Sequence, residues 1–282
     1  MTLLKYLYIG IFAATLVLGD IYFTVFNPSD KGDKEYDIKN KWELPKELNE
    51  VSGITWLDDG NLACIQDEEG IIFIYNLNSK KITKKIPFGD AGDFEGLSAE
   101  GNTIYALRSD GTIFKIENYN EENINVSEYD TPLSHKNNTE SLALDKKNNR
   151  LLLAAKDENP GDENYKTIYG FNLNTNRIDS TAILKIDLKS KIFADYEEKK
   201  MYKTFRPSEI AINPLTHETY LLEGVRPKLL VVDTEGNPKR IYKLDHDDFR
   251  QPEGITFSPE GKLFISNEAG KHSANILEVV LD

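Results

Sequence analysis

The chain has 282 residues, of which 39% are hydrophobic and 10% aromatic, enough apolar material for the core of one all-β domain. Its 47 Asp and Glu residues outnumber its 34 Lys and Arg residues, so the formal net charge is −13. This balance argues against a nucleic acid partner, because binding to a phosphate backbone requires clustered Lys and Arg, and the single cysteine excludes an internal disulfide.

The amino-terminal region, residues 1–26, contains a long apolar run whose length fits the ~20 residues of a membrane-spanning helix. Lys5 and the amino terminus predict a cytoplasmic start for this helix. The chain is therefore expected to be a single-pass protein of the cell membrane with its folded part on the periplasmic or extracellular side. A cleaved signal peptide is the alternative, because Ile9 to Leu18 resembles the apolar part of a leader, and the protein would then be secreted. Residues 27–35 are polar and rich in turn formers, which predicts a linker.

A short phrase recurs along the rest of the chain, residues 36–282, and divides it into similar units. In most copies a serine or glutamate is followed by a small residue and an aliphatic one. The intervals between copies are 43, 45, 68 and 45 residues. A period of roughly 40 to 50 residues made of short strands is typical of β-propeller blades. The copies are Ser52-Gly53-Ile54, Glu95-Gly96-Leu97, Glu140-Ser141-Leu142, Ser208-Glu209-Ile210 and Glu253-Gly254-Ile255.

Each of the first four units contains four β-runs separated by turn residues, which predicts a four-stranded antiparallel meander. The fifth unit has only three such runs, Gly254 to Phe257, Lys262 to Ser266 and Asn275 to Val280. The run Tyr36 to Leu44, before the first unit, can supply the missing outer strand and close the ring, which removes exposed sheet edges. The sequence therefore predicts a propeller of five blades. Six blades are disfavoured, because the ~23 extra residues in the long interval fall short of the ~40 that a blade needs, and a short helix near residues 190–203 is expected instead.

Polar side chains are expected to gather at one mouth of the central channel. In a meander whose first strand is innermost, the start of strand one lies beside the end of strand two. Both places carry carboxylate or amide groups in most units, and oxygen ligands without His or Cys are typical of sites for Ca²⁺ or another hard cation. Ca²⁺ is therefore the predicted cofactor, although Glu209 is expected on the other face of its strand. The predicted metal ligands are Glu95, Glu140, Glu253, Glu223 and Asn267.

Basic residues occur at the same mouth, where they can neutralise the glutamates or bind an anionic ligand. A simpler interpretation is that acidic residues such as Asp67 form ordinary turns, since repetition alone produces similar turns. The three recurring glutamates fit this interpretation less well, because each begins a β-run. No residue pattern of a catalytic nucleophile or of a histidine metal site occurs, so no catalytic residue is predicted. The predicted ligand-binding residues are Arg108, Lys156, Arg206 and Asp67.

Several of these phrases resemble the SdiA-regulated, YjiK-like family of bacterial envelope proteins over residues ~45 to 282. They include Val51-Ser52-Gly53-Ile54, Gly92-Asp93-Phe94-Glu95-Gly96-Leu97 and Gln251-Pro252-Glu253-Gly254-Ile255. The resemblance implies a membrane-anchored β-propeller, exported to the periplasm, that binds calcium. It supplies no catalytic residues. The chain departs from the family pattern at Ser208-Glu209 and at Glu140-Ser141, where glycine is usual.

The leading hypothesis for function is a binding module in the cell envelope, whose acidic channel mouth holds Ca²⁺ and presents a surface to a small molecule or an envelope protein. The alternative is a Ca²⁺-dependent hydrolase of a phosphoester or lactone that uses the same channel site, an idea that rests on fold analogy. A scaffold without a small ligand is a third possibility. The sequence leaves the oligomeric state open.

Overall fold

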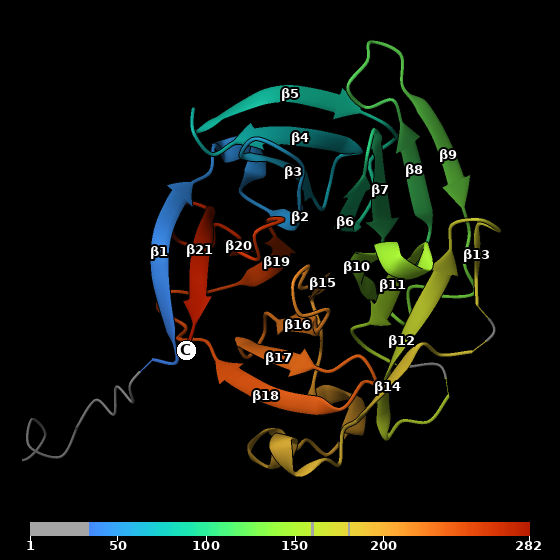
Figure 1. The fold of residues 1–282 in the computed structure, drawn as a ribbon, viewed down its shortest axis with the longest axis vertical. Helices are drawn as coiled ribbons and strands as arrows, with labels where there is room; N and C mark the ends of the chain where they lie inside the picture. Colours follow the sequence, from blue (N-terminus) through green and yellow to red (C-terminus); the bar gives the residue numbers. More distant parts are fainter. Residues whose placement is uncertain (1–33, 159–160, 180) are drawn as a thin grey trace, which may run out of the picture. The chain divides into compact units, whose positions relative to one another are not determined.

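Five antiparallel sheets of short strands surround a central axis, as in Figure 1. The structure is a computed structural model that describes residues 34–158, 161–179 and 181–282. The predicted membrane segment and nearly all of the predicted linker lie outside these residues. Within the described ranges, no helix is long and apolar enough to cross a membrane. Residues Glu35–Asp282 form one compact unit.

The first two blades and the fourth each follow the chain order from the innermost to the outermost strand. In each of these blades, every strand pairs with the next strand in the chain, as in consecutive hairpins. The first blade contains β2 (Val51–Trp56), β3 (Asn61–Gln66), β4 (Ile71–Asn76) and β5 (Lys81–Pro87). The second contains β6 (Phe94–Glu100), β7 (Thr103–Arg108), β8 (Ile113–Glu117) and β9 (Asn125–Tyr129). The fourth contains β15 (Glu209–Ile212), β16 (Thr219–Glu223), β17 (Lys228–Val232) and β18 (Pro238–Lys243).

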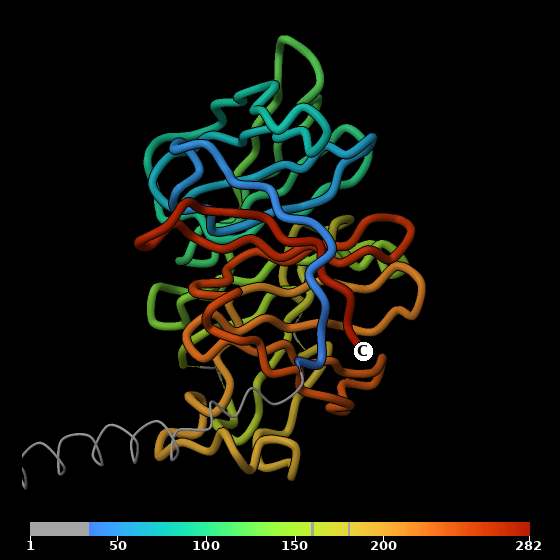
Figure 2. Tube along the Cα trace, turned by 90° about the vertical axis from the view of Figure 1, so that its left-hand side faces the viewer, coloured from blue at the N-terminus to red at the C-terminus, as the bar shows by residue number. Residues whose placement is uncertain are grey.

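The fifth blade joins the two ends of the described chain, which confirms the predicted closure of the ring. It contains β19 (Pro252–Phe257), β20 (Leu263–Asn267) and β21 (Asn275–Leu281), with β1 (Tyr36–Glu43) as its outermost strand. β1 runs antiparallel to β21, with Tyr36 opposite Leu281 and Glu43 opposite Asn275. Figure 2 shows the blue β1 segment alongside the red carboxyl-terminal strand. The edge of the last blade is therefore paired rather than exposed.

The third blade departs from the predicted pattern at its outer edge. Its inner strands are β10 (Thr139–Asp145), β11 (Arg150–Ala155) and β12 (Tyr165–Asn172). Four β-runs predict a single outer strand in this blade, at residues 181–186. The structure instead has two short strands, β13 (Arg177–Ile178) and β14 (Leu184–Asp187), which pair with different halves of β12. The break between β13 and β14 packs against Gly170 of β12. A Cβ atom added at Gly170 would lie 2.8 Å from the Ile183 side chain and 3.0 Å from the Asp179 carboxylate.

The surplus residues of the long interval form two short 3₁₀ helices rather than a sixth blade. These helices are η3 (Lys191–Tyr196) and η4 (Met201–Thr204), and two further 3₁₀ turns occur at η1 (Lys46–Leu48) and η2 (Lys146–Asn148). Arg226 holds the insertion to the fourth blade. Its guanidinium group donates to the Lys203 carbonyl at 2.6 Å and to the Glu198 carboxylate at 3.1 Å.

Replacing this arginine, as Arg226→Ala, should loosen η3 and η4 without unfolding the propeller. The guanidinium group supplies four hydrogen bonds to residues 196–204, and each is worth about 0.5–1.5 kcal/mol net. Hydrogen exchange of residues 191–204 should accelerate at least tenfold, while exchange of the inner strands stays unchanged. Arg177→Ala, an exposed arginine of the third blade, is the control. Unchanged protection of the insertion would contradict this account.

The innermost strands of neighbouring blades pack closely, and a β-bulge at the start of most of them sets the direction of the mouth residues. The pairing register shifts at Ser52, Glu95, Glu140 and Glu253, so each is an extra residue on its strand. Where glycine follows the bulge, as at Gly53, Gly96 and Gly254, a side chain would crowd the next blade. At Gly96, for example, an added Cβ would lie 2.9 Å from the Leu142 Cβ. Glycine in the recurring phrase is therefore explained by the close approach of the inner strands.

Candidate functional site

The starts of the inner strands lie beside the ends of the second strands, as the meander predicted. Phe94 is paired with Arg108, Thr139 with Ala155, and Pro252 with Asn267. The bulged residues and the residues at the second-strand ends therefore share one end of the ring, which we call the channel mouth.

Three of the predicted glutamates form one cluster with a lysine at the channel mouth. The Lys156 Nζ atom lies 2.5 Å from Glu140 Oε2, and Asn138 donates to the other oxygen of Glu140 at 2.7 Å. The charges of Glu95, Glu140 and Glu253 all act on Lys156. Burial alone would lower the pKa of this lysine, but the carboxylates raise it. Lys156 is thus the built-in counter-ion of the cluster.

Burial and mutual repulsion keep protons on these glutamates. Burial, followed by the charges of Glu140 and Asp93, raises the pKa of Glu95 to about 10. Burial also raises the pKa of Glu140 to about 8, against the opposing charge of Lys156. The pKa of Glu253 is raised as well, mainly by burial. One lysine does not neutralise three carboxyl groups, so the cluster carries protons that a cation could replace.

A second group of carboxyl groups extends the mouth toward the first and fifth blades. We call Glu50, Asp67, Glu253 and Glu268 the acidic half of the mouth. Burial, followed by the charges of Glu253, Asp67 and Glu50, raises the pKa of Glu268 to about 8. Burial and the charge of Glu50 raise the pKa of Asp67 to about 6. Within the described residues the buried Oδ1 atom of Asp67 has no hydrogen-bond partner, so an oxygen ligand is available there.

The predicted basic residues are placed differently from one another. Arg206 forms an ion pair with Asp157 at 2.6 Å and lies close enough to Glu140 and Glu253 to lower the pKa of both. Its buried Nε atom donates to no group in the described part of the chain. Arg108 is turned toward its own hairpin, where it pairs with Asp110 at 2.9 Å and lies over the ring of Phe114. The structure thus brings Lys156 and Arg206 to the glutamates, and Arg108 pairs elsewhere.

Two of the predicted metal ligands also lie apart from the cluster. The Glu223 carboxylate is 2.5 Å from the Lys228 Nζ atom, with both side chains fully buried. It also accepts the Arg206 backbone N–H at 3.0 Å, so its position is fixed within the fourth blade. Asn267 donates from Nδ2 to Asn275 at 3.0 Å, and its buried Oδ1 atom has no partner among the described residues.

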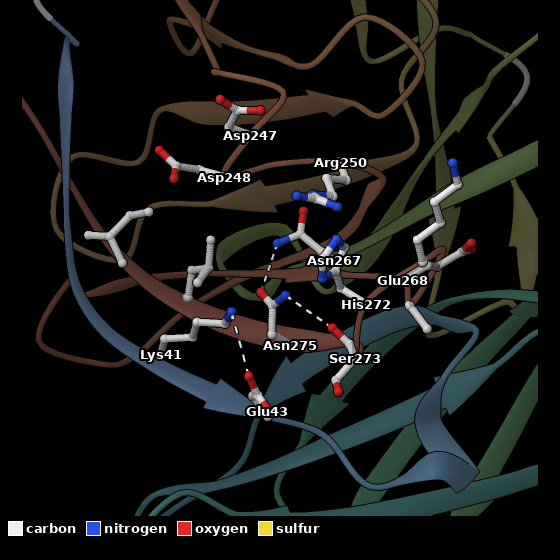
Figure 3. A pocket seen from close by; sticks show the side chains of 14 residues that line it. Lys41, Glu43, Asp247, Asp248, Arg250, Asn267, Glu268, His272, Ser273 and Asn275 are labelled. Atoms are coloured by element: carbon white, nitrogen blue, oxygen red, sulfur yellow. Dashed lines mark hydrogen bonds and ion pairs between the residues drawn. The ribbon is translucent and has the colours of Figure 1, made fainter.

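Asn267 lies in a polar pocket beside the channel mouth, shown in Figure 3, with a volume of about 430 Å³. This side pocket lies between β1, β21 and two loops. The loop after β18 contributes Asp247, Asp248 and Arg250, and the loop after β20 contributes Glu268 and His272. Glu268 is therefore shared between the acidic half of the mouth and the side pocket. The opposite end of the channel has a cavity of about 410 Å³, lined by more apolar residues such as Trp56, Leu144 and Phe257.

Residues 31–271 match the SdiA-regulated family. The chain belongs to this family. No curated protein is similar enough in sequence to count as a match.

Solved structures of similar fold share little sequence with this SdiA-regulated protein. Glutaminyl cyclase from Myxococcus xanthus is 13% identical with a TM-score of 0.60, and the match covers 88% of this chain and 96% of that one. A protein of unknown function from Bacteroides thetaiotaomicron is 10% identical with a TM-score of 0.53, covering 88% and 73%. PQQ-bound aldose sugar dehydrogenase from Streptomyces coelicolor is 13% identical with a TM-score of 0.50, covering 88% and 98%. These likenesses show the propeller fold alone.

In this member of the family, two buried charged residues near the mouth were not predicted as site residues. Glu209 occupies the usual glycine position of its repeat, and its Oε1 atom accepts the Leu142 N–H at 2.6 Å. It thereby fills the junction between β10 and β15, and burial keeps its pKa well above the usual range. Lys166 is fully buried and donates to the Ala155 carbonyl at 2.8 Å. In the sequence, the absence of the usual glycine at position 209 pointed to Glu209, and no signal pointed to Lys166.

Proposed function

We propose that this protein is a binding module of the cell envelope whose acidic channel mouth takes a cation, with Ca²⁺ as the first candidate. The single observation behind this proposal is the clustering of at least five buried or partly buried carboxyl groups at one mouth, where, among the described residues, only Lys156 and Arg206 lie close enough to offset their charge. A divalent cation that displaces the protons of these groups would remove their mutual repulsion. Anchoring in the envelope rests on the apolar run of residues 3–26.

The oxygen donors present suit a hard cation. They do not form a finished cage: in the described ranges, no three Asp, Glu, His or Cys side chains are already arranged around a metal position. Because the Lys156 ammonium group already contacts Glu140, the acidic half is the better place for Ca²⁺. Asp67, Glu253 and Glu268 would hold the ion there, with the unpartnered Asp67 Oδ1 atom as one ligand.

Calorimetry with Ca²⁺ tests this proposal on the wild-type protein and on an Asp67→Asn, Glu268→Gln variant. The wild type should bind one Ca²⁺ with release of protons, and affinity should fall below pH 7 because the carboxyl groups must ionise first. The variant should lose at least about tenfold in affinity, or ~1.4 kcal/mol.

Glu260→Gln is the matched control, because Glu260 lies in a turn and accepts a hydrogen bond from Ser258. It should bind Ca²⁺ as the wild type does. Equal weak heats from the wild type and the double variant would remove the metal from the proposal.

A hydrolase is the second candidate, and the unpartnered Nε atom of Arg206 favours it over a plain metal site. A guanidinium group with a free donor beside an acidic mouth could orient an anionic ester group. A screen with phosphoesters and lactones, with and without a chelator, separates the two candidates. Turnover that needs Ca²⁺ and is lost in Arg206→Lys would support a hydrolase, because lysine keeps the charge without the forked geometry.

A further inference from the structure

We propose that the side pocket is a separate binding site for a small zwitterion, a free amino acid or short peptide that presents both an ammonium and a carboxylate group. This inference does not depend on Ca²⁺ at the channel mouth. Its volume of about 430 Å³ lies within the usual range for small-molecule sites.

The floor of the side pocket contains a buried acceptor, the Asn267 Oδ1 atom, that receives no hydrogen bond from the described residues. Asn267 is 1% exposed, and its Nδ2 atom is used by Asn275. Asn275 in turn donates to the Ser273 carbonyl at 3.5 Å. The Asn267 Oδ1 atom remains buried without a donor among the described residues, and Figure 3 shows the Asn267 side chain directed into the pocket on the side where Arg250 lies. Buried acceptors are normally satisfied, so a ligand N–H is the missing group.

The walls carry charges of both signs. Asp247 and Asp248 lie together on one side of the pocket, and Arg250 projects between them and His272 in Figure 3. In the described part of the chain, no carboxylate forms an ion pair with Arg250. A purely anionic ligand would be repelled by the aspartates, and a purely cationic one by Arg250. A zwitterion fits both walls, with its carboxylate on Arg250 and its ammonium on the aspartates and Asn267.

The wall that carries these charges is held in place before any ligand binds. Phe249, between Asp248 and Arg250, is fully buried, and its ring meets the Tyr36 ring edge-on at 5.2 Å. The Tyr36 hydroxyl donates to Asp248 at 2.8 Å and accepts the Asp245 N–H at 3.2 Å. A fixed wall lowers the entropy cost of binding, as expected of a built site.

The test uses alanyl-alanine and its two blocked forms, N-acetyl-alanyl-alanine and alanyl-alanine amide, in calorimetry with chelator present. We expect the free dipeptide to bind and each blocked form to bind at least about tenfold more weakly. In Arg250→Gln, the difference between the free dipeptide and its amide should vanish. In Asp247→Asn, the difference between the free dipeptide and its acetylated form should shrink in the same way.

Arg177→Gln, an exposed arginine on the third blade, is the matched control and should bind as the wild type does. Equal binding of the three probes, or no binding at about 10 mM, would overturn the proposal. Because chelator is present, failure here says nothing against Ca²⁺ at the mouth, and loss of Ca²⁺ binding in the earlier experiment says nothing against this site.

Discussion

Lys228→Met should reduce the free energy of unfolding by about 3 kcal/mol or more. Lys228 and Glu223 are both fully buried and their charged atoms are 2.5 Å apart. Removing one member of such a pair leaves the other charge buried, which typically costs about 3–5 kcal/mol. The lower end is expected, because Arg226 stays 3.5 Å from the Glu223 carboxylate.

The double variant Lys228→Met, Glu223→Gln should recover most of this loss, because no uncompensated charge then remains in the core. Lys239→Met is the control. The Lys239 side chain is 53% exposed, so the loss of its pair with Glu218 should change stability by less than about 1 kcal/mol. Urea unfolding of the four proteins supplies the comparison. Equal losses of stability for Lys228→Met and Lys239→Met would show that burial does not determine how much the Lys228–Glu223 pair contributes.

Stability should fall as the pH rises from 5 to 7, the reverse of the trend set by carboxylates in salt bridges. Glu95, Glu140 and Glu268 have a pKa of about 10, 8 and 8 in the folded chain, each raised chiefly by burial. Their pKa in the unfolded chain is near 4.3. Between these values the folded chain binds more protons than the unfolded one, so ionisation of the unfolded chain draws the equilibrium toward unfolding.

The size of this trend follows from the number of extra protons. One proton held only by the folded chain corresponds to about 1.4 kcal/mol per pH unit, so each proton retained up to pH 7 contributes a loss on the order of 3 kcal/mol between pH 5 and pH 7. Lys166, whose pKa burial lowers to about 7, contributes in the opposite direction mainly at pH 7 and above, so between pH 5 and pH 7 the carboxyl groups dominate the trend.

Urea midpoints at pH 5, 6 and 7 supply the measurement. The double variant Glu95→Gln, Glu268→Gln should show a smaller fall of stability with pH, since glutamine mimics the protonated acid. Glu218→Gln serves as control, because the hydrogen bond from Lys239 lowers the pKa of Glu218, and its effect is confined to more acidic pH. Stability that is constant or rises between pH 5 and pH 7 in the wild type would be incompatible with protonated glutamates at the mouth.

The predictability of the candidate site varied from residue to residue. Glu95, Glu140 and Glu253 could be grouped because each begins an inner strand in a repeated unit, and symmetry then directs them to one mouth. Arg108 could not be placed by the same reasoning, because Asp110 in the same hairpin competes with the mouth glutamates for the guanidinium group of Arg108. Glu223 was grouped with the mouth by its strand-end position, yet the long lysine opposite it in the next strand, Lys228, holds it in the core.

The sequence by itself determined the number of blades, the order of their strands and the closure of the ring by Tyr36–Glu43. These follow from period, alternation and turn chemistry, which are local properties repeated along the chain. Only the tertiary structure decided which charges are buried together, how Lys156 is shared among three glutamates, and that the closing strand forms one wall of a side pocket. The physical reason is that burial and charge interaction depend on distances of a few ångströms between side chains from different blades, and the sequence does not encode such distances locally.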